Sequence, residues 1–108
     1  MTDFTLVIPT YNRPAQLSRL LRYLNGVPWT LMVLDSSDIQ DAYLPPTPYY
    51  ARFPSDTHPF DKFLSGVNGV DTEYCALCAD DDLVLPAGIE ACLSVLRSHP
   101  SVACTHGF

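Results

Sequence analysis

Basic side chains are scarce in this sequence of 108 residues: six lysines and arginines stand against twelve aspartates and glutamates, giving a net charge of −6. Proteins that hold nucleic acid without sequence preference neutralise phosphates with lysine and arginine, so this balance argues against such a partner. Long apolar runs are missing too, since none approaches the roughly 20 residues that span a bilayer. With no basic, signal-like segment at the start, the simplest expectation is a cytoplasmic domain without a transmembrane segment.

Familiar phosphate and zinc signatures are also absent. The sequence contains no G-x-x-x-x-G-K-[ST] loop and no G-x-G-x-x-G fingerprint, which disfavours an ordinary ATP or NAD site. Cys75 and Cys78 have C-x-x-C spacing, but no second ligand pair at matching spacing completes a zinc site. We therefore expect all four cysteines, which include Cys92 and Cys104, to be buried in strands and helices as small apolar side chains.

Apolar segments of strand length alternate with helical patterns. The sequence predicts strands at residues 4–9, 29–34, 73–79 and 101–106, and a short one within 48–53, inside the proline-rich and largely irregular stretch 39–56. Apolar side chains recur at i, i+3, i+4 and i+7 after three prolines, so helices are expected near Pro14, Pro59 and Pro86. Their apolar faces comprise Leu17, Leu20, Leu21 and Leu24, then Phe60, Phe63, Leu64 and Val67, then Ile89, Cys92, Leu93 and Leu96.

This order of elements predicts one α/β domain over residues 1–108. The sheet is expected to be doubly wound and mostly parallel, with helices on both of its faces. In such sheets ligands sit outside the carboxyl ends of the strands, near the point where the strand order reverses. The residues that follow the predicted strands are therefore the first candidates for a site.

Three consecutive carboxylates, Asp80, Asp81 and Asp82, follow the third long strand. If the chain stays extended there, Asp80 and Asp82 face one point and Asp81 faces away. Two converging carboxylates repel each other unless a cation or proton relieves them, and Mg²⁺ commonly binds one or two carboxylates plus phosphate oxygens. A solvated acidic turn is the alternative for the triplet considered alone.

Two other strand ends should share this rim. The first strand leads into Pro9, Thr10 and Tyr11, close to a helix start, where backbone N–H groups can hold an anion. The second ends at Asp35, whose carboxylate can accept hydrogen bonds from a base N–H or a ribose hydroxyl. Together the three ends describe a pocket for a nucleoside diphosphate with a metal ion.

The segments 6–14, 33–38 and 74–86 resemble, in this order, the nucleotide-sugar half of GT-A-type inverting glycosyltransferases, the large "family two" group. The resemblance covers nearly the whole chain. It implies binding of a nucleotide-diphospho-sugar, a UDP-sugar being favoured, with Mg²⁺ or Mn²⁺ on a D-x-D motif. The acceptor would be a second, unknown substrate.

Carried over residue by residue, the resemblance places Pro9, Thr10 and Tyr11 along the nucleotide, and Asp35 at the position of the acid that reads the base, commonly uracil. The same resemblance gives the acidic triplet and Lys62 their roles.

Asp80 and Asp82 match the D-x-D, with Asp82 as the direct metal ligand and Asp80 nearer the ribose. If the motif is aligned one residue earlier, its first acid falls on Ala79 and Asp81 becomes its principal acid. Lys62 falls where relatives often place a basic residue facing the nucleotide or phosphates. Arg13, Arg19 and Arg22 are expected on a solvated helix face, and Asp38 as a backbone cap.

The sequence departs from the family where an acceptor-binding half with a general base would follow, because it stops at Phe108. No catalytic residue is therefore assigned, and a non-catalytic nucleotide-sugar-binding or assembly domain of a larger protein is the alternative. A receiver-like phosphoacceptor domain is disfavoured because its paired acids follow the first strand, and a nucleotidyltransferase because its glycine-rich, basic loop is absent. A homo-oligomer stays open, since an exposed sheet edge or apolar face could pair with a second copy.

Overall fold

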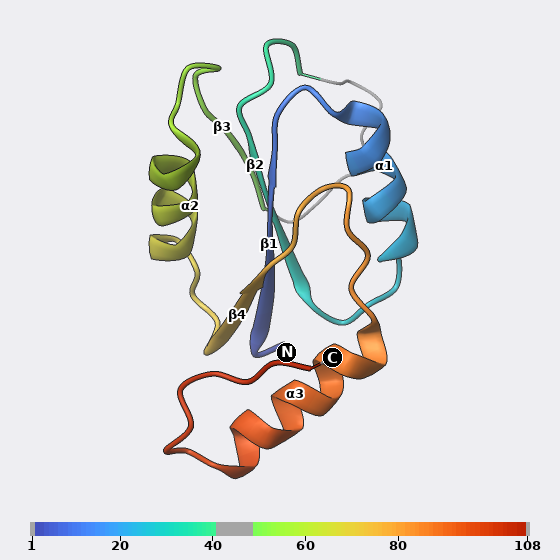
Figure 1. Ribbon diagram of the computed structural model, residues 1–108, viewed down its shortest axis with the longest axis vertical. Coiled ribbons are helices and arrows are strands. Elements are labelled where there is room, and N and C mark those ends of the chain that lie inside the picture. The colour runs from blue at the N-terminus through green and yellow to red at the C-terminus, as the bar shows by residue number, and fades with distance from the viewer. Residues whose placement is uncertain (1, 41–48, 108) are drawn as a thin grey trace.

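A computed structural model describes residues 2–40 and 49–107 of the chain. Its centre is a four-stranded, all-parallel sheet in the order β3-β2-β1-β4 (Figure 1). The strands are β1 (Phe4–Thr10), β2 (Thr30–Asp35), β3 (Tyr49–Arg52) and β4 (Tyr74–Leu77). The predicted α/β class and parallel sheet are confirmed, as is the short strand within 48–53; residues 41–48 of the expected irregular stretch lie outside the described residues.

Within the described residues, three helices pack around the sheet, and each begins at a proline as predicted: α1 (Pro14–Tyr23), α2 (Pro59–Asn68) and α3 (Pro86–Ser98). Proline suits the first turn because its missing N–H would have no partner there. Figure 1 shows α1 and α2 on opposite sides of the sheet, and α3 crossing beneath the amino ends of the strands. The carboxyl ends of the strands are therefore left open at the other end of the molecule.

The larger core lies between the sheet and α1. Leu17, Leu20, Leu21 and Leu24 are all buried, which confirms the predicted apolar face of this helix. They pack with the alternate β1 side chains Phe4, Leu6 and Ile8, with Val33 of β2 and with Leu93 of α3. Gly26, at a φ of 89°, takes the left-handed conformation that ends the α1 segment.

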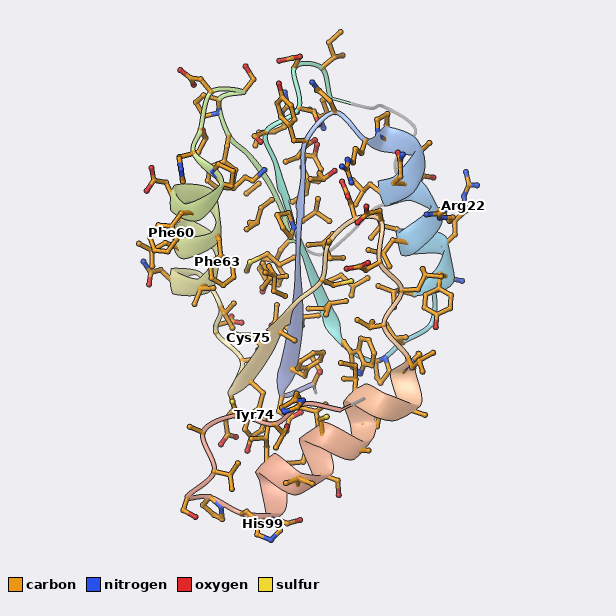
Figure 2. The ribbon with its side chains drawn as sticks, viewed as in Figure 1. Arg22, Phe60, Phe63, Tyr74, Cys75 and His99 are labelled. Carbon is orange, nitrogen blue, oxygen red and sulfur yellow. The ribbon has the colours of Figure 1, made fainter. Side chains whose placement is uncertain are left out.

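A smaller core on the other side consists of Val7, Met32 and Leu34, with Phe53 and Val70 packed against it. The face of α2 predicted to cover it is confirmed only in part. Phe63 and Val67 are half-buried, but Phe60 is 61% exposed and Leu64 is 46% exposed, and Figure 2 shows Phe60 on the outer side of the helix. The buried residues of α2 are Lys62 and Gly66. A Cβ on Gly66 would lie 2.3 Å from Leu34 Cδ1, so the helix approaches the sheet by using a residue without a side chain.

Polar contacts fasten α3 beneath the sheet. The Trp29 indole donates to Glu90 Oε1 at 2.9 Å while its ring packs edge-on against Phe4. The Arg97 guanidinium pairs with the Asp3 carboxylate through two hydrogen bonds of 2.6 and 2.8 Å. These contacts hold α3 at the amino end of the sheet, away from the rim.

The strand predicted at 101–106 is wrong, because residues 102–107 form no strand. After α3 the chain turns back along the helix, where Thr105 Oγ1 donates to the Cys92 carbonyl at 3.4 Å. Because α3 lies under the sheet, the residues that follow it lie along the helix and not beside β4. The strand-like apolar pattern therefore has no neighbouring strand to pair with.

Burial was predicted for four cysteines and is confirmed only for Cys78. Cys92 is half-buried, while Cys75 and Cys104 are exposed, and all four are free thiols. Cys75 lies on β4, an edge strand, where one face has too little covering structure to bury it. Among the described residues, no helix combines the length and the apolar composition required to cross a membrane.

Candidate functional site

The candidate site lies where the chain reverses the direction in which it adds strands. After β1, β2 and β3 are laid down toward one edge, β4 pairs with the free side of β1. The carboxyl ends of β1 and β4 therefore flank the crevice in which open α/β sheets bind ligands. Thr10, the last residue of β1, donates from Oγ1 to Asp80 Oδ2 across this crevice at 2.8 Å, and both side chains are buried.

Arg13 closes the same crevice from the start of α1. Its Nη1 lies 3.3 Å from Asp80 Oδ1 and 3.0 Å from Asp81 Oδ2, so one guanidinium nitrogen bridges two carboxylates. The expected exposure of Arg13 is confirmed, since its side chain is 49% exposed, but its two ion pairs were not expected. The proximity of Asp80, reinforced by Asp81, raises the pKa of Arg13 further above its usual value.

The acidic segment is a turn and not an extended continuation of β4. The Asp82 N–H donates to the Ala79 carbonyl at 3.1 Å, which closes a turn with Asp80 and Asp81 at its two central positions. The expected alternation of an extended chain is therefore wrong here, since Asp80 and Asp81 share a partner. Asp82, expected as the direct metal ligand, is exposed next to them.

Asp35 is a buried carboxylate of the rim that several hydrogen-bond donors hold in place. It is 2% exposed, and its Oδ1 accepts a 2.8 Å hydrogen bond from the Ser37 backbone N–H. Its Oδ2 accepts from the Tyr50 hydroxyl and, at 3.1 Å, from Arg52 Nη1. The Ser37 side chain also hydrogen-bonds this carboxylate, so groups of the chain occupy most of its roughly four lone-pair positions.

Opposing effects set the charge of Asp35. Burial by itself would raise its pKa, but the hydrogen bonds from Ser37, Tyr50 and Arg52 together outweigh burial and lower it. Burial and the same carboxylate raise the pKa of Tyr50 to about 12. Asp35 is thus an anion and Tyr50 a neutral donor over the physiological range.

A pocket of about 290 Å³ opens beside Asp35 on the α1 side of the rim. Asn12 and Asp38 join its two loops reciprocally: Asn12 Nδ2 donates to Asp38 Oδ2, and the Asp38 N–H donates to Asn12 Oδ1, each at 2.9 Å. Ser37 Oγ also accepts from the Asn12 N–H at 2.8 Å. The pocket is lined by Thr10, Asn12, Pro14, Leu17, Asp35, Ser37, Asp38 and Ile39.

Lys62 reaches the rim from the opposite side of the sheet. It is 4% exposed, and its ammonium group donates to the Thr10 carbonyl at 3.0 Å and to Ser36 Oγ at 2.7 Å. Burial lowers its pKa, although Asp35 and Asp80 act in the other direction. Lys62 thus ties β1 to β2 below the pocket and is not among the residues that line it.

Replacing Lys62 with methionine is expected to reduce the free energy of unfolding by about 1 kcal/mol, because Ser36 Oγ loses its ammonium donor while the Thr10 carbonyl keeps the Ser36 N–H as its donor. Urea denaturation followed by circular dichroism measures the change. Asp61→Asn, an exposed change on the same helix, is the matched control. Unchanged stability in the methionine variant would show that the ammonium group does not brace the strand ends.

Two of the three candidates from the loop after β1 lie beside the pocket without lining it. Pro9 is the penultimate residue of β1 and is half-buried, whereas Tyr11 is 49% exposed beyond the strand end. Thr10 alone of these three loop residues lines the pocket and also contacts the acidic turn.

Sequence reasoning missed Arg13, Tyr50 and Arg52 as parts of this site. Tyr50 and Arg52 are two positions apart on β3, so their side chains share one face, and the strand register sets Arg52 beside Asp35. That signal becomes readable only once β3 is known to pair with β2. Arg13 stands directly before a helix-starting proline, which fixes its backbone but says nothing of a partner 67 positions away.

The acidic turn suits a hard cation shared with a ligand. Its carboxylate oxygens match the preferences of Mg²⁺ and Mn²⁺, and Asp80 and Asp81 already bind one cationic group, Arg13. Among the described residues, no group of three or more histidine, cysteine, aspartate or glutamate side chains forms a cage. A metal ion at this turn would have to take Asp80 and a neighbouring acid as its protein ligands and complete its shell with other oxygens.

Comparison with known proteins adds no relative: no protein-family model matches the chain, and no curated protein matches it significantly.

Proposed function

We propose that this chain binds a nucleotide-diphospho-sugar together with Mg²⁺ or Mn²⁺, as the donor-binding part of a GT-A-like inverting glycosyltransferase of the "family two" type. The observation that carries the proposal is the position of Thr10. Thr10 lines the pocket beside Asp35, and its hydroxyl donates a hydrogen bond to Asp80 at the crevice between β1 and β4. The proposed pocket for the nucleoside is therefore adjacent to the proposed site for the diphosphate and its metal ion.

In this proposal the pocket on the α1 side takes the nucleoside. Asp35 is an acceptor without a proton to donate, so it favours a base edge that presents an N–H, such as that of uracil. The surrounding donors hold the carboxylate in one orientation before the ligand arrives. That preorganisation lowers the ordering cost of binding. It suits a uridine nucleotide, which donates from its ring N3–H, whereas a cytidine nucleotide can donate only from its exocyclic amine.

The diphosphate would extend from the pocket past Thr10 to the acidic turn. A divalent cation bound there supplies charge compensation for the leaving nucleoside diphosphate. Asp80 is fixed by the Thr10 hydroxyl, so its second oxygen keeps a defined direction. Asp81 and Asp82, the more exposed acids of the turn, would supply further carboxylate oxygens for the cation.

Isothermal titration calorimetry with UDP tests the proposal. We expect binding in the presence of Mn²⁺ and at least about tenfold weaker binding in EDTA, because the diphosphate would then meet uncompensated carboxylates. CDP should bind at least about tenfold more weakly than UDP. Failure of UDP-, GDP- and dTDP-sugars all to bind with Mn²⁺ present would refute the proposal.

A non-catalytic nucleotide-sugar-binding domain is the second candidate. It is favoured by one observation: the buried carboxylates Asp35 and Asp80 are both engaged by donors of the chain, which suits holding a ligand more than taking a proton from an acceptor. Incubation with a UDP-sugar distinguishes the two. Release of UDP, detected by a coupled assay, supports the enzyme, whereas binding without turnover supports the binding domain.

A further inference from the structure

Arg13 occupies an unusual place for an arginine at the start of a helix. It precedes Pro14, its own side chain makes no capping hydrogen bond, and its guanidinium extends to the turn that follows β4. There one nitrogen, Nη1, lies within 3.3 Å of oxygens from both Asp80 and Asp81. A cation bridging the two acids would need the same oxygens.

The surroundings make this contact exchangeable. The side chain of Arg13 is 49% exposed, so it can leave for solvent without opening the core, whereas Asp80 is 6% exposed and is held by Thr10. Arg13 is the only cationic side chain that pairs with the acidic turn among the described residues. The guanidinium is therefore the movable member of the cluster and the carboxylates are the fixed ones.

We infer that Arg13 is a built-in counter-ion that competes with a divalent cation for Asp80 and Asp81, so that the cation binds well only together with a diphosphate. The inference rests on the proposed function for the identity of the cation and the diphosphate. When the cation enters, Arg13 is displaced toward the open side of the crevice, where phosphate oxygens offer it new acceptors. Arg13 thereby couples the two binding events by making the first one unfavourable alone.

Binding of Mn²⁺ without nucleotide tests the competition directly, through the loss of the free-Mn²⁺ signal in electron paramagnetic resonance. Arg13→Gln is expected to bind Mn²⁺ about fivefold more tightly than the wild type, the size expected for loss of a half-exposed ion pair. Arg13→Lys, which keeps the charge, should gain less. Arg22→Gln, on the outer side of α1 in Figure 2, makes the same change in net charge and should leave the affinity within about twofold of wild type.

Addition of UDP tests the coupling. UDP should increase the Mn²⁺ affinity of the wild type by a larger factor than that of Arg13→Gln. An Arg13→Gln variant that folds normally by circular dichroism and binds Mn²⁺ no more tightly than the wild type overturns the inference, as does equal tightening in Arg22→Gln. If UDP binds to none of the proteins, the proposed function fails, while the Mn²⁺ comparison still decides whether Arg13 competes.

Discussion

Replacing Asp80 with asparagine is expected to weaken Mn²⁺-dependent UDP binding by at least about 100-fold. The amide keeps the shape of the side chain and can still accept from Thr10, but it removes the buried negative charge that faces the crevice. Calorimetry with UDP and Mn²⁺ gives the affinity, and circular dichroism establishes that the variant is folded. The loss should be much smaller in EDTA, because the charge acts through the cation.

Asp71→Asn is the matched control for this change. Asp71 is an exposed acid in the connection from α2 to β4, at the amino end of the sheet and away from the rim. The two variants have the same net charge, so a shared loss of affinity would reflect the overall field of the protein. Wild-type UDP affinity in a folded Asp80→Asn protein would contradict the assignment of this carboxylate to the cation.

Replacing Asp35 with asparagine is expected to reduce both ligand affinity and stability. Asp35 accepts from Ser37, Tyr50 and Arg52, and the neutral amide weakens all three of these hydrogen bonds at a buried position. We expect a loss of roughly 2 kcal/mol in the free energy of unfolding. UDP binding should weaken by at least about tenfold, with a smaller preference over CDP.

Tyr50→Phe separates the two effects of Asp35. It removes one donor and leaves the carboxylate and Arg52, so it should cost about 1 kcal/mol of stability. Its preference for UDP over CDP should persist, because the acceptor remains. An equal loss of base preference in Tyr50→Phe and Asp35→Asn would show that Asp35 does not read the base directly.

The stability that Asp35 contributes should depend on pH. Its folded-state pKa lies below the ordinary value of 3.8, so folding favours the carboxylate form. The contribution is complete above the unfolded-state pKa and is lost as the pH falls through the lower folded-state value. The gap in unfolding free energy between the wild type and Asp35→Asn should therefore narrow below about pH 4 in urea titrations.

Much of the fold could be read from local patterns. Prolines at three helix starts and the leucines of α1 are local signals, and the structure follows them. The failures arise where packing overrides pattern. On α2 the apolar side of Phe60 and Leu64 faces outward, because close approach to Leu34 requires Gly66 and the two strand ends require the ammonium of Lys62.

In the candidate site, too, some residues could be predicted from local patterns and others depend on how the chain packs. Asp35 and Thr10 could be located because parallel strands end at one rim, and residues at strand ends are identifiable from the sequence. The partners of Asp35 on β3 depend on strand register, and the link from Arg13 to the acidic turn depends on how a turn orients two carboxylates. Neither geometry is encoded in the spacing of the residues concerned.

The hydrogen bond between Thr10 and Asp80 joins residues 70 positions apart. The contact requires β1, β4 and the acidic turn to be in place together, so it belongs to the folded chain. A ligand that bridges Thr10 and the acidic turn would bind the folded chain and not its unfolded ensemble. It would therefore raise the midpoint of thermal unfolding in proportion to the logarithm of its concentration, making the site a reporter of complete folding.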